Sequence, residues 1–264
     1  MSNWSNVLGR VSFVNCDPLF HGLPNDWDVL PAPPAWLTGH LLRKDCLVAP
    51  IPAADYAKHH SELMLLPNIG IASDGNVGSV LLFSKRELDS IRDIALPTDS
   101  STSRKLVMYI LEHHGLDPKA TEMGPDLDHM LNQCDAALLI GDRALDEAHR
   151  HPELVKLDLG AEWKNITGLP MVFAVFAAPI DSDKEILRRA HKDLLSNARN
   201  FNEDMTFKED VIISTSNRSG FSNDRVKQYF SEVTNILDDT AVNGLELFLQ
   251  DVCEMDLPIN WLDV

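Results

Sequence analysis

Small polar side chains stand where several predicted strands end, and they are the residues of this chain whose types suit ligand binding. The set comprises Asn15, Ser73, Asp74, Ser79, Asp142, Thr167 and the cluster Thr98–Ser103, which contains Ser100, Ser101 and Thr102. Amides and hydroxyls can orient the carboxylates of a ligand by donating hydrogen bonds. The set therefore predicts a binding cleft, although it does not indicate a type of reaction.

The segment Ile71–Lys85, IASDGNVGSVLLFSK, combines a polar turn at residues 73–76 with the apolar run Val77–Phe83. The run suits a buried strand, because it is rich in β-branched and aromatic residues and too short for a typical helix. Its two glycines allow a positive φ or a close backbone approach, and Ser79 adds a hydroxyl. The segment is either an ordinary turn before a core strand or a loop that presents hydroxyls and N–H groups to a ligand.

Asn15 ends a predicted strand, Gly9–Asn15, and Pro18 prevents further pairing. The carboxyl ends of strands form the usual ligand-facing edge of an open α/β sheet. The Thr98–Ser103 cluster precedes a predicted helix, Lys105–His114, so its members are expected as N-caps. A helix N-terminus also attracts anions. These residues can act as caps alone or can also contact a ligand.

Motifs that specify a reaction are missing. The sequence contains no Walker A loop, GxGxxG, HExxH or GxSxG. His59-His60 and His113-His114 are adjacent pairs whose side chains diverge on a helix, and no metal site is expected. His21 follows the Asn15 turn and can face the cleft, but we favour a structural or indirect role.

Composition excludes some partners. The 264-residue chain carries a net charge of −17, which argues against nucleic acid and anionic membranes. The N-terminal segment lacks the pattern of a secretory signal, and no apolar run is long enough to span a bilayer. The four cysteines are scattered, as expected for reduced thiols in a cytoplasmic protein.

Predicted strands alternate with helices, which indicates an α/β class with parallel sheets. The apolar runs Val77–Phe83 and Met171–Ala178 are expected to cross between two lobes that close over a cleft. We expect residues 1–88 plus 178–264 to form one discontinuous lobe and residues 89–177 the other. The last part of the chain is predicted to be helical, and it can serve as a homodimer surface.

Five segments in order resemble one known family. They are GRVSFVNCDPLFHGL, PIPAADYAKH, IASDGNVGSVLLFSK, AALLIGDRAL and DLGAEWKNITGLPMVFAVF. The chain resembles the chorismate dehydratases of the futalosine route to menaquinone. The resemblance implies a two-lobed, type II periplasmic-binding-protein-like α/β fold with a helical C-terminal tail. It implies a cytoplasmic enzyme that converts chorismate to 3-[(1-carboxyvinyl)oxy]benzoate without a metal or organic cofactor.

The resemblance also implies residue roles. Asn15 matches the family's active-site asparagine, and Ser79 and the Thr98–Ser103 cluster match its substrate-contacting segments. Cys16, Asp17 and residues 53–55 differ from the residues that are most common in the family at these positions. The resemblance therefore does not support a hydrogen bond from a hydroxyl at position 53 or 54 to the substrate. The N-terminal sequence motif around Asn15 favours the dehydratase over the later naphthoate-forming enzyme of the same route.

Two questions stay open at this level. An amide is not a normal general base, so Asn15 is expected to orient the substrate or its leaving hydroxyl. The proton acceptor is either the substrate's own enolpyruvyl carboxylate or a carboxylate such as Asp17 or Asp74. The main alternative function is a non-enzymatic cytoplasmic sensor or binding protein for a small carboxylate, because a fold does not decide a function.

Overall fold

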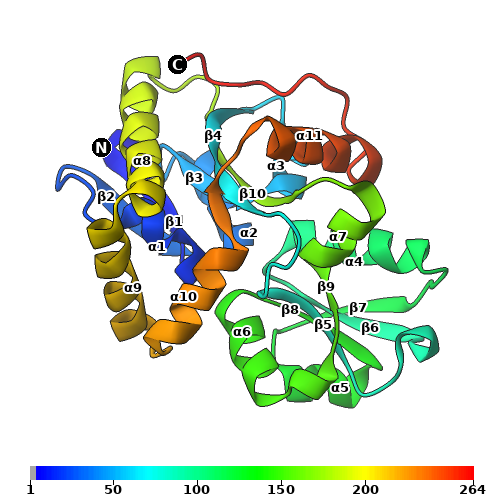
Figure 1. Cartoon of the computed structure of the whole chain (residues 1–264). Helices are drawn as coiled ribbons and strands as arrows, with labels where there is room; N and C mark the ends of the chain where they lie inside the picture. Colours follow the sequence, from blue (N-terminus) through cyan, green and yellow to red (C-terminus); the bar gives the residue numbers. More distant parts are fainter. Residues whose placement is uncertain (1–3) are drawn as a thin grey trace.

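The computed structural model describes residues 4–264, and residues 1–3 of the N-terminal segment considered above lie outside it. The chain forms two α/β units, which Figure 1 shows side by side. The first unit is built on a four-stranded sheet in the order β11-β4-β10-β3 and a two-stranded parallel sheet, β1-β2. Its strands are β1 (Val7–Val11), β2 (Asp28–Ala32), β3 (Ala49–Pro52), β4 (Leu63–Ser73), β10 (Met171–Pro179) and β11 (Thr234–Ile236).

The second unit is built on a five-stranded sheet in the order β7-β6-β8-β5-β9. Its strands are β5 (Val80–Ser84), β6 (Asp93–Pro97), β7 (Lys119–Met123), β8 (Ala136–Ile140) and β9 (Val155–Asp158). Its helices are α4 (Ser101–His113), α5 (Leu127–Gln133), α6 (Gly141–Arg150) and α7 (Leu159–Thr167), with short 3₁₀ turns at Leu88–Ser90 and Pro152–Leu154. All residues of β5 and β8 are buried, as their unbroken apolar sequences require.

Helices from both ends of the chain cover the first unit (Figure 1). They are α1 (Asp17–Phe20), α2 (Pro34–Leu42), α3 (Ala53–His59), α8 (Lys184–Glu203), α9 (Met205–Ser219), α10 (Asn223–Glu232) and α11 (Asp239–Leu247). Short 3₁₀ turns occur at Trp4–Asn6 and Val14–Cys16, and a π-helical turn at Phe248–Val252 follows α11. Asp183 caps α8 by accepting from the N–H groups of Glu185 and Ile186, and the helix buries Leu187, Ala190, Leu194 and Ala198.

Only some strand pairs are parallel, contrary to the expectation of parallel sheets. β6 pairs in parallel with β7 and β8, whereas β10 runs antiparallel to both β3 and β4, and β5 runs antiparallel to both β8 and β9. The reason is the path of the chain. β5 and β10 are the first strands after each crossing between the units, so they enter their sheets from the opposite end.

Sheet membership places the crossings between residues 73 and 80 and between residues 167 and 171. The expected lobes, 1–88 plus 178–264 and 89–177, placed β5 in the first lobe and most of β10 in the second. We propose that the lobes divide instead within these two connections. In the described part of the chain, no helix has both the length and the apolar character needed to cross a membrane.

Helix α11 packs against the start of β10 so closely that Gly244 has no space for a side chain. A Cβ atom there would lie 2.1 Å from the carbonyl oxygen of Pro170. Glycine normally weakens a helix, but here it permits the contact. The backbone on the other side cannot move as a flexible side chain could.

Gly244→Ala is therefore expected to lower the free energy of unfolding by about 1–3 kcal/mol. Gly39→Ala in helix α2 is the matched control, because the atoms nearest to its Cβ would be the flexible end of the Arg43 side chain. That variant is expected to gain up to about 1 kcal/mol. Urea unfolding of both variants tests the difference, and equal stabilities would contradict this account of the α11 contact.

Candidate functional site

A small pocket lies between the two units, with a cavity volume of about 50 Å³. Residues from both sheets line it. They are Val11, Phe13, Asn15, Pro34, Pro52, Ile71, Phe173 and Ala174 from the first unit, and Val77, Ser79, Val80, Ser100, Ser103, Ile140 and Gly141 from the crossing and the second unit. Most of these side chains are apolar, so the few polar ones decide how a ligand is oriented.

Asn15 is the polar side chain without a partner in this pocket. It lies in the 3₁₀ turn Val14–Cys16, directly after β1. Its amide oxygen Oδ1 is buried and makes no hydrogen bond within residues 4–264. Its backbone oxygen is held by Asn235, whose Nδ2 donates over 3.2 Å. A buried amide oxygen without a partner is costly, so this atom is suited to receive a donor from a ligand.

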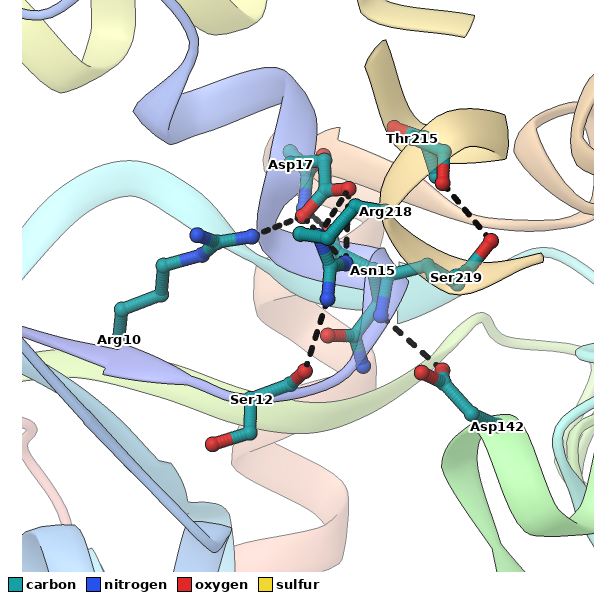
Figure 2. Close-up of polar contacts among 10 residues, drawn as sticks. Arg10, Ser12, Asn15, Asp17, Asp142, Thr215, Arg218 and Ser219 are labelled. Carbon is teal, nitrogen blue, oxygen red and sulfur yellow. Dashed lines mark hydrogen bonds and ion pairs between the residues drawn. The ribbon is translucent and has the colours of Figure 1, made fainter. Parts of the chain in front are cut away.

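Asp17 holds the Asn15 turn from the side of the first unit. Its side chain is 8% exposed and is paired with Arg10 of β1 and with Arg218 of α9, whose Nη2 lies 2.8 Å from Oδ2. Figure 2 shows both guanidinium groups converging on this carboxylate. Asp17 is not among the residues that line the pocket. Its oxygens serve to fix the start of α1 against α9.

Ser79 brings a hydroxyl to the pocket from the crossing segment. Its Oγ lies 3.0 Å from the hydroxyl of Tyr229 in α10, and its carbonyl oxygen accepts from the N–H of Gly141 over 2.7 Å. Burial raises the pKa of Tyr229 above its ordinary value. The tyrosine therefore stays neutral and can donate to Ser79.

Three helices of the chain begin at this pocket. Pro34 is the first residue of α2, Ser100 is the N-cap of α4, and Gly141 is the first residue of α6. The Oγ of Ser100 accepts from the N–H of Ser103 over 3.3 Å, which confirms that Ser100 acts as a cap. Helix N-termini carry partial positive charge. In α2, Pro34 has no N–H and the next two N–H groups donate to Asp99 O and Pro33 O, so the termini of α4 and α6 are the ones that favour an anion, although the chain as a whole carries −17.

Asp142 stands beside the pocket without lining it. Its Oδ1 accepts from the backbone N–H of Val14 over 3.0 Å. Burial raises the pKa of this carboxyl to about 6, and the hydrogen bond from Val14 and the nearby Arg218 act in the opposite direction.

The sequence matches a known family across most of its length. A model of the family described as "Menaquinone biosynthesis" matches residues 7–254. This chain belongs to the menaquinone-biosynthesis family. A protein of Thermus thermophilus named chorismate dehydratase is 34% identical over 214 residues, which cover 73% of this chain and 79% of that protein.

Solved structures show the fold. A protein from Archaeoglobus fulgidus superposes with a TM-score of 0.70 at 19% identity, covering 94% of this chain and 96% of its own. The alkanesulfonate-binding protein SsuA of Xanthomonas axonopodis pv. citri gives 0.69 at 13% identity, covering 97% and 95%. A Candida albicans protein described as having the generic periplasmic-binding-protein fold gives 0.67 at 15% identity, covering 96% and 91%. The predicted periplasmic-binding-protein fold is confirmed.

The structure brings together only part of the predicted site. Asn15, Ser79 and, from the Thr98–Ser103 cluster, Ser100 and Ser103 line the pocket, and Asp142 touches the Asn15 turn. The others lie outside the lining, and most are engaged locally. Ser73 donates to Gly75 O, Asp74 pairs with Lys164, Ser101 lines a separate groove, Thr102 accepts from Ala54 N, and Thr167 donates to Trp163 O. Their assignment to substrate binding stays a prediction that this geometry does not favour.

His21 also lies outside the pocket lining, with its ring edge-on to Phe207 at 5.3 Å between centroids. Residues 4–264 contain no group of three or more His, Cys, Asp or Glu side chains placed to hold a metal ion.

Sequence reasoning missed Tyr229 and the aromatic walls Phe13 and Phe173. Tyr229 is 1% exposed and belongs to an apolar helical stripe, so its pattern is that of an ordinary core residue. Phe13 and Phe173 lie in or beside strands and look like ordinary core side chains. Their contact with the pocket depends on how the two sheets meet, which no local pattern reports.

Tyr229→Phe removes one partner of the buried Ser79 hydroxyl, so we expect a loss of about 1–2 kcal/mol in the free energy of unfolding. Tyr109→Phe is the control, because the Tyr109 side chain is only half-buried and its ring packs against Trp163. Chemical denaturation of both variants tests this, and equal effects would show that the Ser79–Tyr229 bond adds nothing.

Proposed function

We propose that this chain removes water from chorismate to give 3-[(1-carboxyvinyl)oxy]benzoate, and so acts as a hydro-lyase in menaquinone biosynthesis. The observation that carries the proposal is the unpartnered Oδ1 of Asn15, buried in an apolar pocket between the two units. Membership of the menaquinone-biosynthesis family and the identity to a chorismate dehydratase support it.

The lining of the pocket suits a ring that carries carboxylates. Chorismate carries two carboxylates and a six-membered ring. Apolar walls, including Phe13 and Phe173, can cover the ring, and the N-termini of α4 and α6 favour the carboxylates. Ser79 and Ser100 add hydroxyl groups that can donate to carboxylate oxygens.

The reaction needs orientation more than strong acids or bases. The proton leaves the ring carbon that bears the ether oxygen, and its electron pair forms the new double bond as the adjacent C–O bond breaks. The hydroxyl leaves with a proton as water, and the ring becomes aromatic. Negative charge that moves into the ring carboxylate is stabilised by the donors around it.

Asn15 is proposed to hold the leaving hydroxyl. Its Oδ1 can accept from that hydroxyl, and its Nδ2 can donate to the same oxygen as the C–O bond lengthens. An amide at this position cannot take the ring proton at neutral pH.

The substrate's own enolpyruvyl carboxylate is the proposed proton acceptor, and it returns the proton to the departing oxygen. Neither protein candidate suits the role in this structure. Asp17 is occupied by Arg10 and Arg218, and Asp74 is 66% exposed and paired with Lys164. Among residues 4–264, no carboxylate lines the pocket.

The direct test is incubation of the purified protein with chorismate, followed by chromatography and mass analysis of the products. Loss of one water, with formation of an aromatic enolpyruvyl ether well above the uncatalysed background, is the expected result. Binding of chorismate without turnover would contradict the proposal and favour the small-carboxylate binding protein. Absence of both binding and turnover would show that chorismate is not the substrate. Activity of the later, naphthoate-forming enzyme of the route would also contradict the proposal.

Asn15→Ala is expected to lower kcat at least about 100-fold, because the group that orients the leaving hydroxyl is lost in a water-poor site. KM for chorismate should change only a few-fold. Asn165→Ala is the control, since Asn165 bonds Glu162 on the surface. Steady-state kinetics of both variants check this, and normal turnover by Asn15→Ala would remove Asn15 from the mechanism.

A further inference from the structure

A hydrogen bond joins the two units beside the Asn15 turn. The carboxylate of Asp142, near the start of α6 in the second unit, accepts from the N–H of Val14 in the first unit, 128 positions away in the sequence. Val14 directly precedes Asn15, and Figure 2 shows Asp142 reaching this turn from the opposite side to Arg10.

The Asp142–Val14 hydrogen bond gives a partner to a backbone N–H group that has none among the described residues of the first unit. Val14 is the first residue of a 3₁₀ turn, and Phe13, its N-cap residue, provides no side-chain acceptor. The first N–H groups of a helical turn need an acceptor from elsewhere. Asp142 therefore acts as an N-cap supplied by the other unit.

The segment that leads into the Asn15 turn and the start of α6 also meet without space between them. Gly141 has a φ of +62°, and a Cβ atom there would lie 2.5 Å from the ring of Phe13. The Asp142–Val14 bond and the Phe13–Gly141 contact thus form together, and only while the units are close. Separation of the units would break both.

We propose that Asp142 is a positioning residue, a latch that fixes the Asn15 turn when the two units close over the pocket. The expected effect of the latch on turnover rests on the proposed function, whereas its effect on the conformation of the Asn15 turn does not. Because the Asn15 side chain lacks a protein partner for its Oδ1, its direction depends on the backbone of this turn. A shift of about 1 Å in such a group can cost about 100-fold in rate.

Ionisation of Asp142 should weaken the latch, because the charged carboxylate is buried when the units are close. Around the carboxylate lie Asp17 of α1, Arg143 of α6, Arg218 of α9 and the neutral Tyr229 of α10. With its pKa raised to about 6, the carboxyl is charged at pH 8 and largely neutral at pH 5. A neutral carboxyl still accepts from Val14 through its carbonyl oxygen and loses the burial penalty of the charge, so the closed arrangement should become more favourable as the pH falls through this range.

Two variants separate the latch from other roles. Asp142→Ala removes the acceptor, whereas Asp142→Asn keeps an oxygen for Val14 without the charge. Asp126→Ala is the control, because Asp126 caps α5 at an exposed position of the same unit by accepting from the N–H of His129 over 2.8 Å. Thermal melts show whether each variant is folded.

The first measurement is amide hydrogen exchange at Val14, followed by NMR, which does not depend on activity. We expect exchange at least about 10-fold faster in Asp142→Ala, near wild type in Asp142→Asn, and unchanged in the control. Unchanged exchange at Val14 in Asp142→Ala would overturn the latch.

The second measurement is turnover of chorismate between pH 5 and pH 8. In Asp142→Ala, kcat should fall about 10- to 100-fold with KM little changed, and in Asp142→Asn it should stay within a few-fold of wild type at pH 8. Asp142→Asn should also lose the pH dependence near pH 6 that the ionisation of Asp142 causes in the wild-type protein. Equal loss in both variants would overturn the positioning role, because it would show that the charge itself acts on the substrate. If the wild-type protein leaves chorismate unchanged, the proposed function fails, and Val14 exchange still decides the latch.

Discussion

The buried ion pairs of Asp17 connect parts of the chain that are far apart in the sequence. Arg10 belongs to β1 and Arg218 to α9, and both meet one carboxylate at the start of α1. A buried carboxylate requires such partners, and the loss of both arginines would leave an uncompensated charge. The C-terminal helices therefore help to fix the N-terminal turn that carries Asn15. The Asn15 turn also forms one wall of the pocket between the units.

The pocket exists because the chain crosses twice between two sheets. β4 ends at Ser73 and β5 begins at Val80, so the Gly75–Ser79 stretch passes from one unit to the other. Asp158 stabilises this crossing by accepting from the N–H groups of Val77 and Gly78. Ser79 follows directly and faces the pocket. The segment that links the units thus also supplies part of the site.

Electrostatics in this protein are local rather than global. The net charge of −17 repels anions at long range. Within the pocket, the N-termini of α4 and α6 and a few hydroxyl groups provide the favourable potential. These donors are fixed by the fold before a ligand arrives, so little reorganisation accompanies charge movement in the reaction.

The sequence alone determined the alternation of strands and helices, the two apolar runs and the polar residues at strand ends. Asn15, Ser79 and Ser100 were identified in this way, because strand ends and helix caps have local signatures. The tertiary structure decided which of them meet. Thr102 has the same local pattern as Ser100, yet its hydroxyl is used by Ala54. Tyr229, Arg218 and the Asp142–Val14 bond depend on contacts between segments 128 to 201 residues apart. Such contacts follow from how the sheets and terminal helices pack, and hydrophobic periodicity contains no information on that arrangement.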